Sequence, residues 1–309
     1  MHATNATLPP EERTAPPGAD GAIFARLFRS ARLYAGSFAL PVLVWQLIFF
    51  VAPLCFLVAM SFWVVQSYRL VPDFDTGNWA RVLGMKVFWD AYARTFAMAA
   101  GAAALISVLA FPVTCFLAFR LSPAARRLAM LMLVVPFFTS YLVRAYTWQV
   151  FLADDGIVNA ALTAIGLQDL AMLNTVFGTF VGYVTLCLPL VILLQLMSVA
   201  SVDRTLIEAA RNLRCSPMRT VFRVVIPASR VGLTLGATFC FILVFGDFVS
   251  PTYLGGGNAP TLGILITDFT KAGNQWPRAA VVAITMIATL LTVAFLAVRF
   301  AYRKTGETA

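Results

Sequence analysis

Residues 95–119, TFAMAAGAAALISVLAFPVTCFLAF, form a run of 25 residues without a single Asp, Glu, Lys or Arg. About 20 apolar residues in an α-helix are enough to cross the hydrocarbon core of a bilayer. Three further charge-free runs reach that length, at residues 33–68, 170–202 and 279–298. These four runs predict membrane-spanning helices, because lipid leaves no water to satisfy the backbone of an irregular segment.

Two more apolar stretches reach the same length if one charge is tolerated in each. Residues 128–153 contain Arg144, and residues 231–250 contain Asp247. The six predicted helices cover approximately residues 38–64, 95–119, 128–150, 174–198, 231–250 and 279–301.

The composition supports the same fold class. Hydrophobic residues make up 60% of the 309-residue chain and charged residues 12%, against roughly 45–50% and about 25% in soluble domains. The mean hydropathy is +0.83. We therefore predict an all-α polytopic membrane protein with six transmembrane helices.

The distribution of positive charge predicts the orientation. Of the 23 Lys and Arg residues, 16 lie on one side of the predicted helices, at residues 13–32, 120–127, 204–230 and 299–304. The positive-inside rule places that side, and both termini, in the cytoplasm. Topology thus accounts for the net charge of +9, and no nucleic-acid partner is needed to explain it.

The sequence also predicts how the chain is divided. Residues 1–22 are expected to be a disordered cytoplasmic tail, residues 23–36 an interfacial amphipathic helix, residues 37–302 the transmembrane domain, and residues 303–309 a cytoplasmic tail. The only histidine is His2, so no His-based metal site or general base is expected, and the five cysteines are interpreted as reduced packing residues.

The long loop at residues 200–230 has the pattern of two short helices. Asp203 is suited to cap the first, and Ser216 followed by Pro217 is typical of the start of the second. Apolar residues recur at helical spacing and arginines lie between them, which indicates a protruding pair of helices that docks onto another protein. An ordinary amphipathic surface loop is the alternative.

The residues of this loop resemble a known motif. Glu208-Ala209-Ala210-Arg211-Asn212-Leu213, Ser216-Pro217 and Val225-Ile226-Pro227 resemble the EAA loop of ABC importer permeases, which couples the membrane subunit to a cytoplasmic ATPase. The resemblance implies a coupling role for Glu208, Ala209, Ala210, Arg211, Leu213, Arg214, Ser216, Pro217, Phe222 and Pro227.

One position of this loop departs from the family pattern. Arg214 stands where the family usually has glycine. Without a glycine, the expectation is that the tight turn is altered or that Arg214 adopts an ordinary αR-type turn instead.

Two other blocks resemble PotB-type spermidine/putrescine permeases. They are residues 136–148 with Asp155-Gly156-Ile157-Val158-Asn159, and residues 246–251 with Leu254-Gly255-Gly256-Gly257. That family commonly has Glu where Asp247 stands. The match is specific to type I permeases that depend on a binding protein, and less specific to the polyamine branch.

The resemblance implies a multi-pass permease subunit in the bacterial inner membrane. Its expected partners are cytoplasmic ATP-binding subunits, a second permease subunit in a heterodimer or a homodimer, a periplasmic solute-binding protein, the small-molecule substrate and membrane lipid. Its expected substrate is a polyamine such as putrescine or spermidine, or another small solute. The sequence has no Walker A motif, so ATP and Mg²⁺ are expected on the ATPase partner, with no cofactor, metal or catalytic residue on this chain.

Four residues are candidates for the translocation pathway: Asp247, Tyr141, Arg144 and Trp148. A charge at the centre of a membrane helix costs roughly 2.5–3.5 kcal/mol on insertion scales, so each one requires a reason. Asp247 either faces a cationic solute or makes a structural hydrogen bond to a neighbouring helix or to Thr252. Arg144 either faces the pathway or snorkels to the outer interface. The two aromatic residues either belong to an interfacial belt or contact an amine.

Two other function classes are possible in principle. A stand-alone secondary transporter or channel would not need the long inner loop, and the chain has no obvious inverted repeat. A membrane-embedded enzyme is disfavoured because the sequence offers no usable histidine, no paired carboxylates within a span and no nucleophile motif.

Overall fold

A computed structural model describes residues 40–257 and 260–302. The predicted tails and the predicted interfacial helix at residues 23–36 lie outside the described residues. The chain divides into two compact units, of which the first ends at Leu57 and the second starts at Val58.

In the first unit the described residues are helical. They belong to a candidate membrane span, Leu40–Met60, that includes the π-helix η1 (Leu47–Val51) and continues as α2 (Ala52–Met60). The span is four residues shorter at its end than predicted, because residues 64–66 pair with residues 69–71 as a β-hairpin in the second unit.

Three long helices of the second unit confirm predicted spans. They are α4 (Lys86–Phe119), α8 (Val176–Val199) and α15 (Trp276–Ala301). α4 begins nine residues before the predicted start at residue 95, and its 34 residues give a length of about 51 Å at about 1.5 Å per residue. It is therefore longer than the roughly 30 Å hydrocarbon core.

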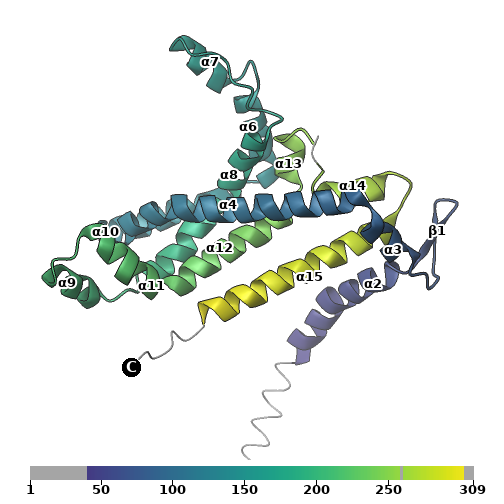
Figure 1. Cartoon of the computed structure of the whole chain (residues 1–309), viewed down its shortest axis with the longest axis horizontal. Helices are drawn as coiled ribbons and strands as arrows, with labels where there is room; N and C mark the ends of the chain where they lie inside the picture. The colour runs from purple at the N-terminus through teal and green to yellow at the C-terminus, as the bar shows by residue number, and fades with distance from the viewer. Residues whose placement is uncertain (1–39, 258–259, 303–309) are drawn as a thin grey trace, which may run out of the picture. The chain divides into compact units, whose positions relative to one another are not determined.

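The core of this unit lies where α4, α8 and α12 (Arg230–Phe245) pack against one another, as Figure 1 shows. α15 packs on α12 and on α14 (Leu262–Lys271). Many buried positions of α4 are alanines, and small residues let membrane helices approach closely enough for dispersion contacts. Among the largest fully buried side chains are Tyr183, Phe88, Phe245 and Ile106.

The predicted helix that carries Arg144 is broken, because residues 123–138 and 141–164 meet at 91°. A second bend, of 76°, lies between residues 217–228 and 230–245, before the start of the helix predicted at residues 231–250. The continuous helix predicted at residues 128–150 is thus wrong, because the chain is extended at Thr139 and Ser140. The described residues contain four helices that can span a membrane, or six if each bent pair counts as one span.

The helix predicted at residues 231–250 is also shorter than expected. α12 ends at Phe245, and Gly246, Asp247 and Phe248 separate it from α13 (Val249–Tyr253). Asp247 therefore lies at a break between two helices rather than within a helix.

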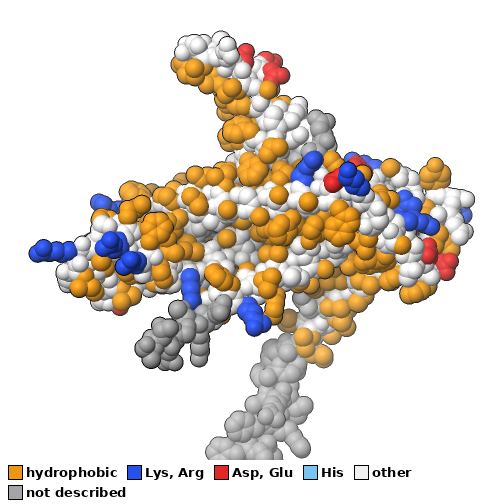
Figure 2. Space-filling model, in the orientation of Figure 1, with side chains coloured by type: hydrophobic (Ala, Val, Ile, Leu, Met, Phe, Trp, Pro, Cys, Tyr) orange, Lys and Arg blue, Asp and Glu red, His pale blue; other side chains and the backbone are white. Residues whose placement is uncertain are grey.

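The remaining elements are short. They are the hairpin strands β1 (Val64–Gln66) and β2 (Arg69–Val71), the helices α3 (Gly77–Gly84), α5 (Pro123–Val134), η2 (Val135–Phe138), α6 (Tyr141–Leu152) and α7 (Ile157–Ala164), and the loop helices α9 (Arg204–Asn212), α10 (Pro217–Thr220), η3 (Val221–Val225) and α11 (Ile226–Ala228). The hairpin is antiparallel, with Val64 paired to Val71 and Gln66 to Arg69. Figure 2 shows hydrophobic side chains along the length of α4 and Lys and Arg side chains gathered over α9 and α10.

Candidate functional site

The coupling loop, residues 200–230, contains two helix starts that the sequence predicts. The Asp203 carboxylate accepts the backbone N–H of Thr205 at 2.9 Å and caps α9. This hydrogen bond lowers the pKa of Asp203. The Ser216 hydroxyl accepts the backbone N–H of Arg219 at 3.4 Å, and Pro217 is the first residue of α10. Both predicted N-caps are confirmed.

The turn between these helices is closed by Arg214 in the left-handed conformation. Its φ is +54°, so the expectation of an αR-type turn is wrong. The backbone N–H of Arg214 donates to Arg211 O at 2.8 Å, and that of Cys215 donates to Ala210 O at 3.0 Å. These two bonds form a Schellman motif, whose left-handed position is usually glycine. The tight turn therefore forms without the glycine, with an arginine in a conformation that disfavours a side chain.

The strain at this turn yields a prediction. The Arg214→Gly variant removes the clash of a Cβ in the left-handed region, worth about 1 kcal/mol. We expect amide hydrogen exchange in residues 204–216 to slow by about fivefold in the purified protein, because 1 kcal/mol corresponds to about that factor. Arg219→Gly, which places a glycine inside α10, is the matched control and should speed exchange. Faster exchange in Arg214→Gly would contradict the strained turn.

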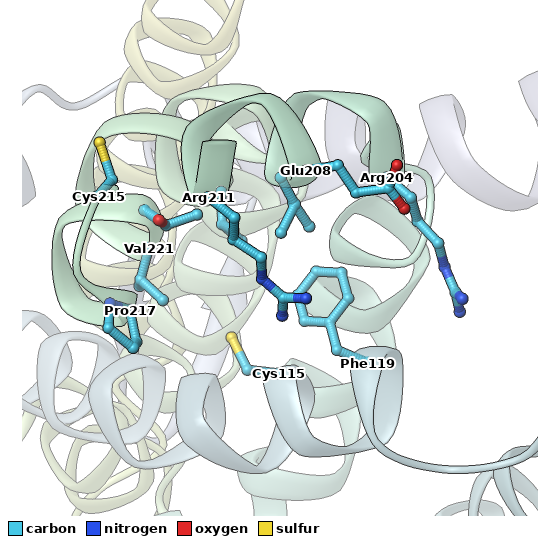
Figure 3. A pocket seen from close by; sticks show the side chains of 11 residues that line it. Cys115, Phe119, Arg204, Glu208, Arg211, Cys215, Pro217 and Val221 are labelled. Atoms are coloured by element: carbon cyan, nitrogen blue, oxygen red, sulfur yellow. The ribbon is translucent and has the colours of Figure 1, made fainter. Parts of the chain in front are cut away.

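Beneath the loop lies a cavity of about 320 Å³, between α9, the helix that starts at Pro217, and the last turns of α4. Figure 3 shows Cys115 and Phe119 of α4 below it and Glu208 and Arg211 of α9 above it. The charged side chains that line it are Glu208, Arg204 and Arg211. The cavity lies between the two helices of the loop and the end of α4.

The ten predicted coupling residues all lie in the loop at residues 200–230, and the structure shows which of them are exposed. Ala210 is buried against the rest of the loop. The other nine are exposed: Glu208, Ala209, Arg211, Leu213, Arg214, Ser216, Pro217, Phe222 and Pro227.

Large apolar side chains stand out on this surface. Leu213 is 79% exposed, Phe222 62% and Met218 67%. Met218, beside Pro217 in the second helix, is not among the residues predicted from the motif. Exposed apolar residues that cluster with arginines are typical of a protein-binding surface.

Pro227, at the end of the motif, does not stop the second helix of the loop. The helix continues through η3 and α11 to Ala228. Pro227 cannot donate a hydrogen bond to the carbonyl four residues earlier. The π-helical turn immediately before Ile226, with the Ile226 N–H bonded to Val221 O, lets the helix pass the proline, and the break follows at Ser229.

A buried polar cluster joins the start of α6 to the break between α12 and α13. Tyr141 Oη, at the start of α6, donates to Asp247 Oδ2 at 2.7 Å and is also hydrogen-bonded to the Ser250 hydroxyl. The Asp247 carboxylate accepts the backbone N–H groups of Val249 at 2.8 Å and Ser250 at 3.2 Å. Asp247 is only 8% exposed. The structure therefore brings Tyr141 and Asp247 together, and the carboxylate bonds to a neighbouring helix and caps α13 rather than bonding to Thr252.

Glycines allow α8 to approach this cluster. A methyl group at Gly182 would lie 2.5 Å from Ser250 Oγ, and one at Gly178 would lie 2.7 Å from Leu254 O. The two glycines are one helical turn apart, so they form one small face of α8. This Gly-xxx-Gly pair thus allows a close approach to α13 and Leu254.

Arg144 points into the protein. Its Nη1 donates to Thr185 O at 2.9 Å and its Nη2 to Pro136 O at 3.0 Å. Snorkelling is thus the wrong explanation for this residue, because Nη1 and Nη2 bind backbone carbonyls of neighbouring elements, while Nε is buried without a hydrogen-bond partner among the described residues.

Trp148 occupies a different environment from the polar cluster. It lines an apolar cavity of about 390 Å³ with Leu105 of α4 and Phe177 and Phe180 of α8. Its ring also contacts Phe151, with centroids 5.9 Å apart. The cavity walls are almost entirely hydrophobic, which suits lipid or an apolar side chain better than a hydrated amine.

A cavity of about 260 Å³ lies beside α13. It is lined by Arg94 and Met98 of α4, by Val176 and Thr179 of α8, and by Pro251, Gly255 and Thr261. Arg94 is the charged residue of this lining, and it is not among the four residues predicted for the pathway.

A buried glutamine was also missed. Gln195 of α8 is 0% exposed, donates to Ser107 O at 3.2 Å and accepts from Thr114 Oγ1 at 3.4 Å. Its partners belong to α4, so this side chain links the two helices. The signal in the sequence was a polar amide within a charge-free run, where it needs a partner.

Comparisons with known proteins are consistent with this architecture. A family model described as "Binding-protein-dependent transport system inner membrane component" matches residues 110–306. The chain is 29% identical over 245 residues to the spermidine/putrescine transport system permease protein PotB of Salmonella typhimurium (strain SL1344), covering 78% of this chain and 85% of that protein. The PotB protein of Haemophilus influenzae is 27% identical over 269 residues, covering 84% and 92%.

Similar proteins also include the inner membrane ABC transporter permease protein YdcU of Escherichia coli (strain K12), 27% identical over 270 residues that cover 82% of this chain and 85% of that protein. A chain in the structure of a bacterial alginate ABC transporter with its periplasmic protein has a TM-score of 0.69 at 18% identity, covering 92% of this chain and 99% of that chain. A chain of the MetNI methionine ABC transporter has a TM-score of 0.52 at 17% identity, covering 69% and 93%. At these identities the structural likeness concerns the fold.

Proposed function

This chain belongs to the family of inner-membrane components of binding-protein-dependent transport systems, and from that membership we propose that it moves a polyamine such as putrescine or spermidine into the cell. It is a multi-pass permease subunit of an ABC importer in the inner membrane, and its family is a membrane component rather than an enzyme. A stand-alone secondary transporter therefore no longer needs to be considered.

The polyamine proposal rests on two supports. The relatives named PotB are spermidine/putrescine permeases and align with most of the chain. The observation that carries it within the chain is the Asp247 carboxylate, at the break between α12 and α13, which accepts a hydrogen bond from Tyr141 Oη at 2.7 Å. An ammonium group adds the attraction of opposite charges to its hydrogen bond with a carboxylate, whereas the neutral Tyr141 hydroxyl contributes only a hydrogen bond. A passing ammonium group could therefore displace the Tyr141 hydroxyl from Asp247 Oδ2.

Transport is proposed to follow alternating access. In this scheme ATP binds to cytoplasmic subunits that receive the exposed face of the coupling loop, with Glu208, Leu213 and Phe222 at the contact. Closure of those subunits would shift the population from inward-open to outward-open states. A periplasmic binding protein would deliver the solute, and a second permease subunit, most simply a different chain in a heterodimer, would complete the pathway.

A second candidate substrate class is favoured by one observation. Arg94 lines the cavity beside α13, and a fixed cation there would repel a polyamine. A small anionic or neutral solute would suit that cavity better. The two substrate classes differ in the residue that would attract the solute: Asp247 would attract a cation, and Arg94 would attract an anion.

The experiment is to delete the chain in its native host and to measure uptake of labelled putrescine and spermidine and of a panel of anionic and neutral solutes. Selective loss of polyamine uptake is expected. ATP depletion with the proton gradient maintained should stop the same uptake. Intact polyamine uptake with loss of another solute would refute the polyamine proposal and favour the second candidate.

A further inference from the structure

Pro189 interrupts the hydrogen bonding of α8. Because proline has no backbone N–H, it cannot donate to the carbonyl of Thr185, four residues earlier. The guanidinium of Arg144, on α6, lies there instead, with Nη1 2.9 Å from Thr185 O. The donor that α8 lacks is thus supplied by a side chain of another helix.

The same guanidinium also binds a carbonyl beside a second helix irregularity. Its Nη2 lies 3.0 Å from Pro136 O, in η2, just before the chain breaks at Thr139 and Ser140. The planar fork of an arginine can direct two donors to two acceptors at once, which a lysine ammonium cannot reproduce. Arg144 therefore binds carbonyls next to two separate helix irregularities.

The depth of this contact makes it costly to lose. Thr185 is the tenth residue of the 24-residue α8, which places it about 14 Å along the helix at about 1.5 Å per residue. A backbone carbonyl at that depth has no water to replace a missing donor. Burying the charge of Arg144 in the membrane also costs free energy. Its pairing with the two carbonyls offsets that cost and also the cost of leaving the Thr185 carbonyl without a donor.

A second anchor lies on the same face of α6. Tyr141, three residues before Arg144, bonds to Asp247 and Ser250 at the break between α12 and α13. Residues three apart in a helix are neighbours on its surface. One face of α6 therefore fastens that helix both to α8 and to the α12–α13 break.

We propose that Arg144 is a positioning residue that replaces the backbone donor missing at Pro189 and thereby fixes the α5–α6 break against α8. This role requires no contact between Arg144 and the solute. It rests on the proposed function only where uptake is the readout, since the contact itself is a property of the folded chain.

The test is a double-mutant cycle in the full transporter complex purified in detergent. Arg144→Met removes both donors, and we expect the melting temperature to fall by about 5 °C and the maximal uptake rate to fall at least about tenfold. Pro189→Ala returns a backbone N–H to α8. In the Arg144→Met background it is expected to recover at least about half of the lost melting temperature, a coupling that independent sites do not show.

Two further variants are controls for the double-mutant cycle, one for the proline and one for the charge of Arg144. Pro112→Ala removes the other internal proline of a long core helix, in α4, and is expected to give no recovery in the Arg144→Met background. Arg144→Lys keeps the charge but not the fork, and is expected to recover less than half of the lost stability. The concentration of solute that gives half-maximal uptake should stay unchanged in both Arg144 variants.

Three results would overturn the proposal. The first is an equal effect of Pro189→Ala with and without Arg144. The second is full stability in Arg144→Lys. The third is a raised half-saturating concentration in Arg144→Met with an unchanged melting temperature, which would make Arg144 a solute contact. Melting temperatures are measured without solute, so an error in the proposed substrate leaves this test intact.

Discussion

Replacing Glu208 by lysine is expected to abolish ATP-driven uptake while the protein still inserts into the membrane. Glu208 is exposed on α9 and lines the same cavity as Arg204 and Arg211. A lysine would place a third positive charge beside two arginines and reverse the charge offered to the partner. Charge changes at a buried protein contact typically cost about 2–5 kcal/mol, which weakens association by roughly 30-fold or more.

The measurement for Glu208 is co-purification of the ATPase subunits together with uptake in reconstituted vesicles. Glu208→Gln, which keeps the size and removes the charge, is the matched control and should retain part of both signals. Thr205→Lys adds a cation to an exposed position of the same helix and tests whether charge alone is responsible. Normal uptake in Glu208→Lys would refute a coupling role for this surface.

The second large effect is expected at Asp247. In Asp247→Ala the Tyr141 hydroxyl and the backbone N–H groups of Val249 and Ser250 lose an acceptor that lies within 3.2 Å of each. Each buried donor left without a partner costs about 1–3 kcal/mol. We expect a lower melting temperature, a disordered start of α13 and little or no uptake.

Asp247→Asn separates the charge of this residue from its capping role. The amide oxygen can still accept the Val249 N–H, and Tyr141 Oη can rotate to accept a hydrogen rather than donate one. The Ser250 N–H loses its acceptor Oδ2, so the melting temperature should fall, but by less than in Asp247→Ala, and assembly should be retained. If the carboxylate attracts a cationic solute, polyamine uptake should fall at least about tenfold. Unchanged affinity and rate in Asp247→Asn would make Asp247 purely structural.

The contrast between Asp247 and Arg94 separates the two candidate substrate classes. Arg94→Gln removes the charge from the cavity beside α13. For a polyamine importer we expect uptake to be retained or increased, because a repulsive charge is lost. A loss of uptake of an anionic solute, with no effect on polyamine uptake, would favour the second candidate.

Much of the architecture could be predicted from local patterns. The charge-free runs at residues 95–119, 170–202 and 279–298 each correspond to a long apolar helix of the second unit. The N-caps at Asp203 and Ser216 are correct as well. Hydropathy and capping depend on residues a few positions apart, so a single sequence contains the information needed to place them.

The breaks of the two charged spans were not visible in the same way. Residues 128–150 and 231–250 read as continuous apolar helices, although the chain bends at Ser140 and α12 ends at Phe245. Hydropathy measures only how apolar a segment is. A helix in a protein-lined environment can break wherever side chains from elsewhere satisfy the freed backbone groups, and those side chains lie on other helices.

The membrane class, the approximate spans and the two-helix pattern of the loop at residues 200–230 follow from composition and short-range spacing, so they could be predicted from the amino-acid sequence. The contacts of the charged residues depend instead on how the helices pack. Tyr141 and Asp247 are 106 positions apart, and Arg144 and Thr185 are 41 positions apart. No local pattern pairs such residues, because their hydrogen bonds exist only after α6, α8 and the α12–α13 break have packed together. Arg214 shows the same limit on a smaller scale, since two backbone hydrogen bonds of the turn hold it in a conformation that its own preferences disfavour.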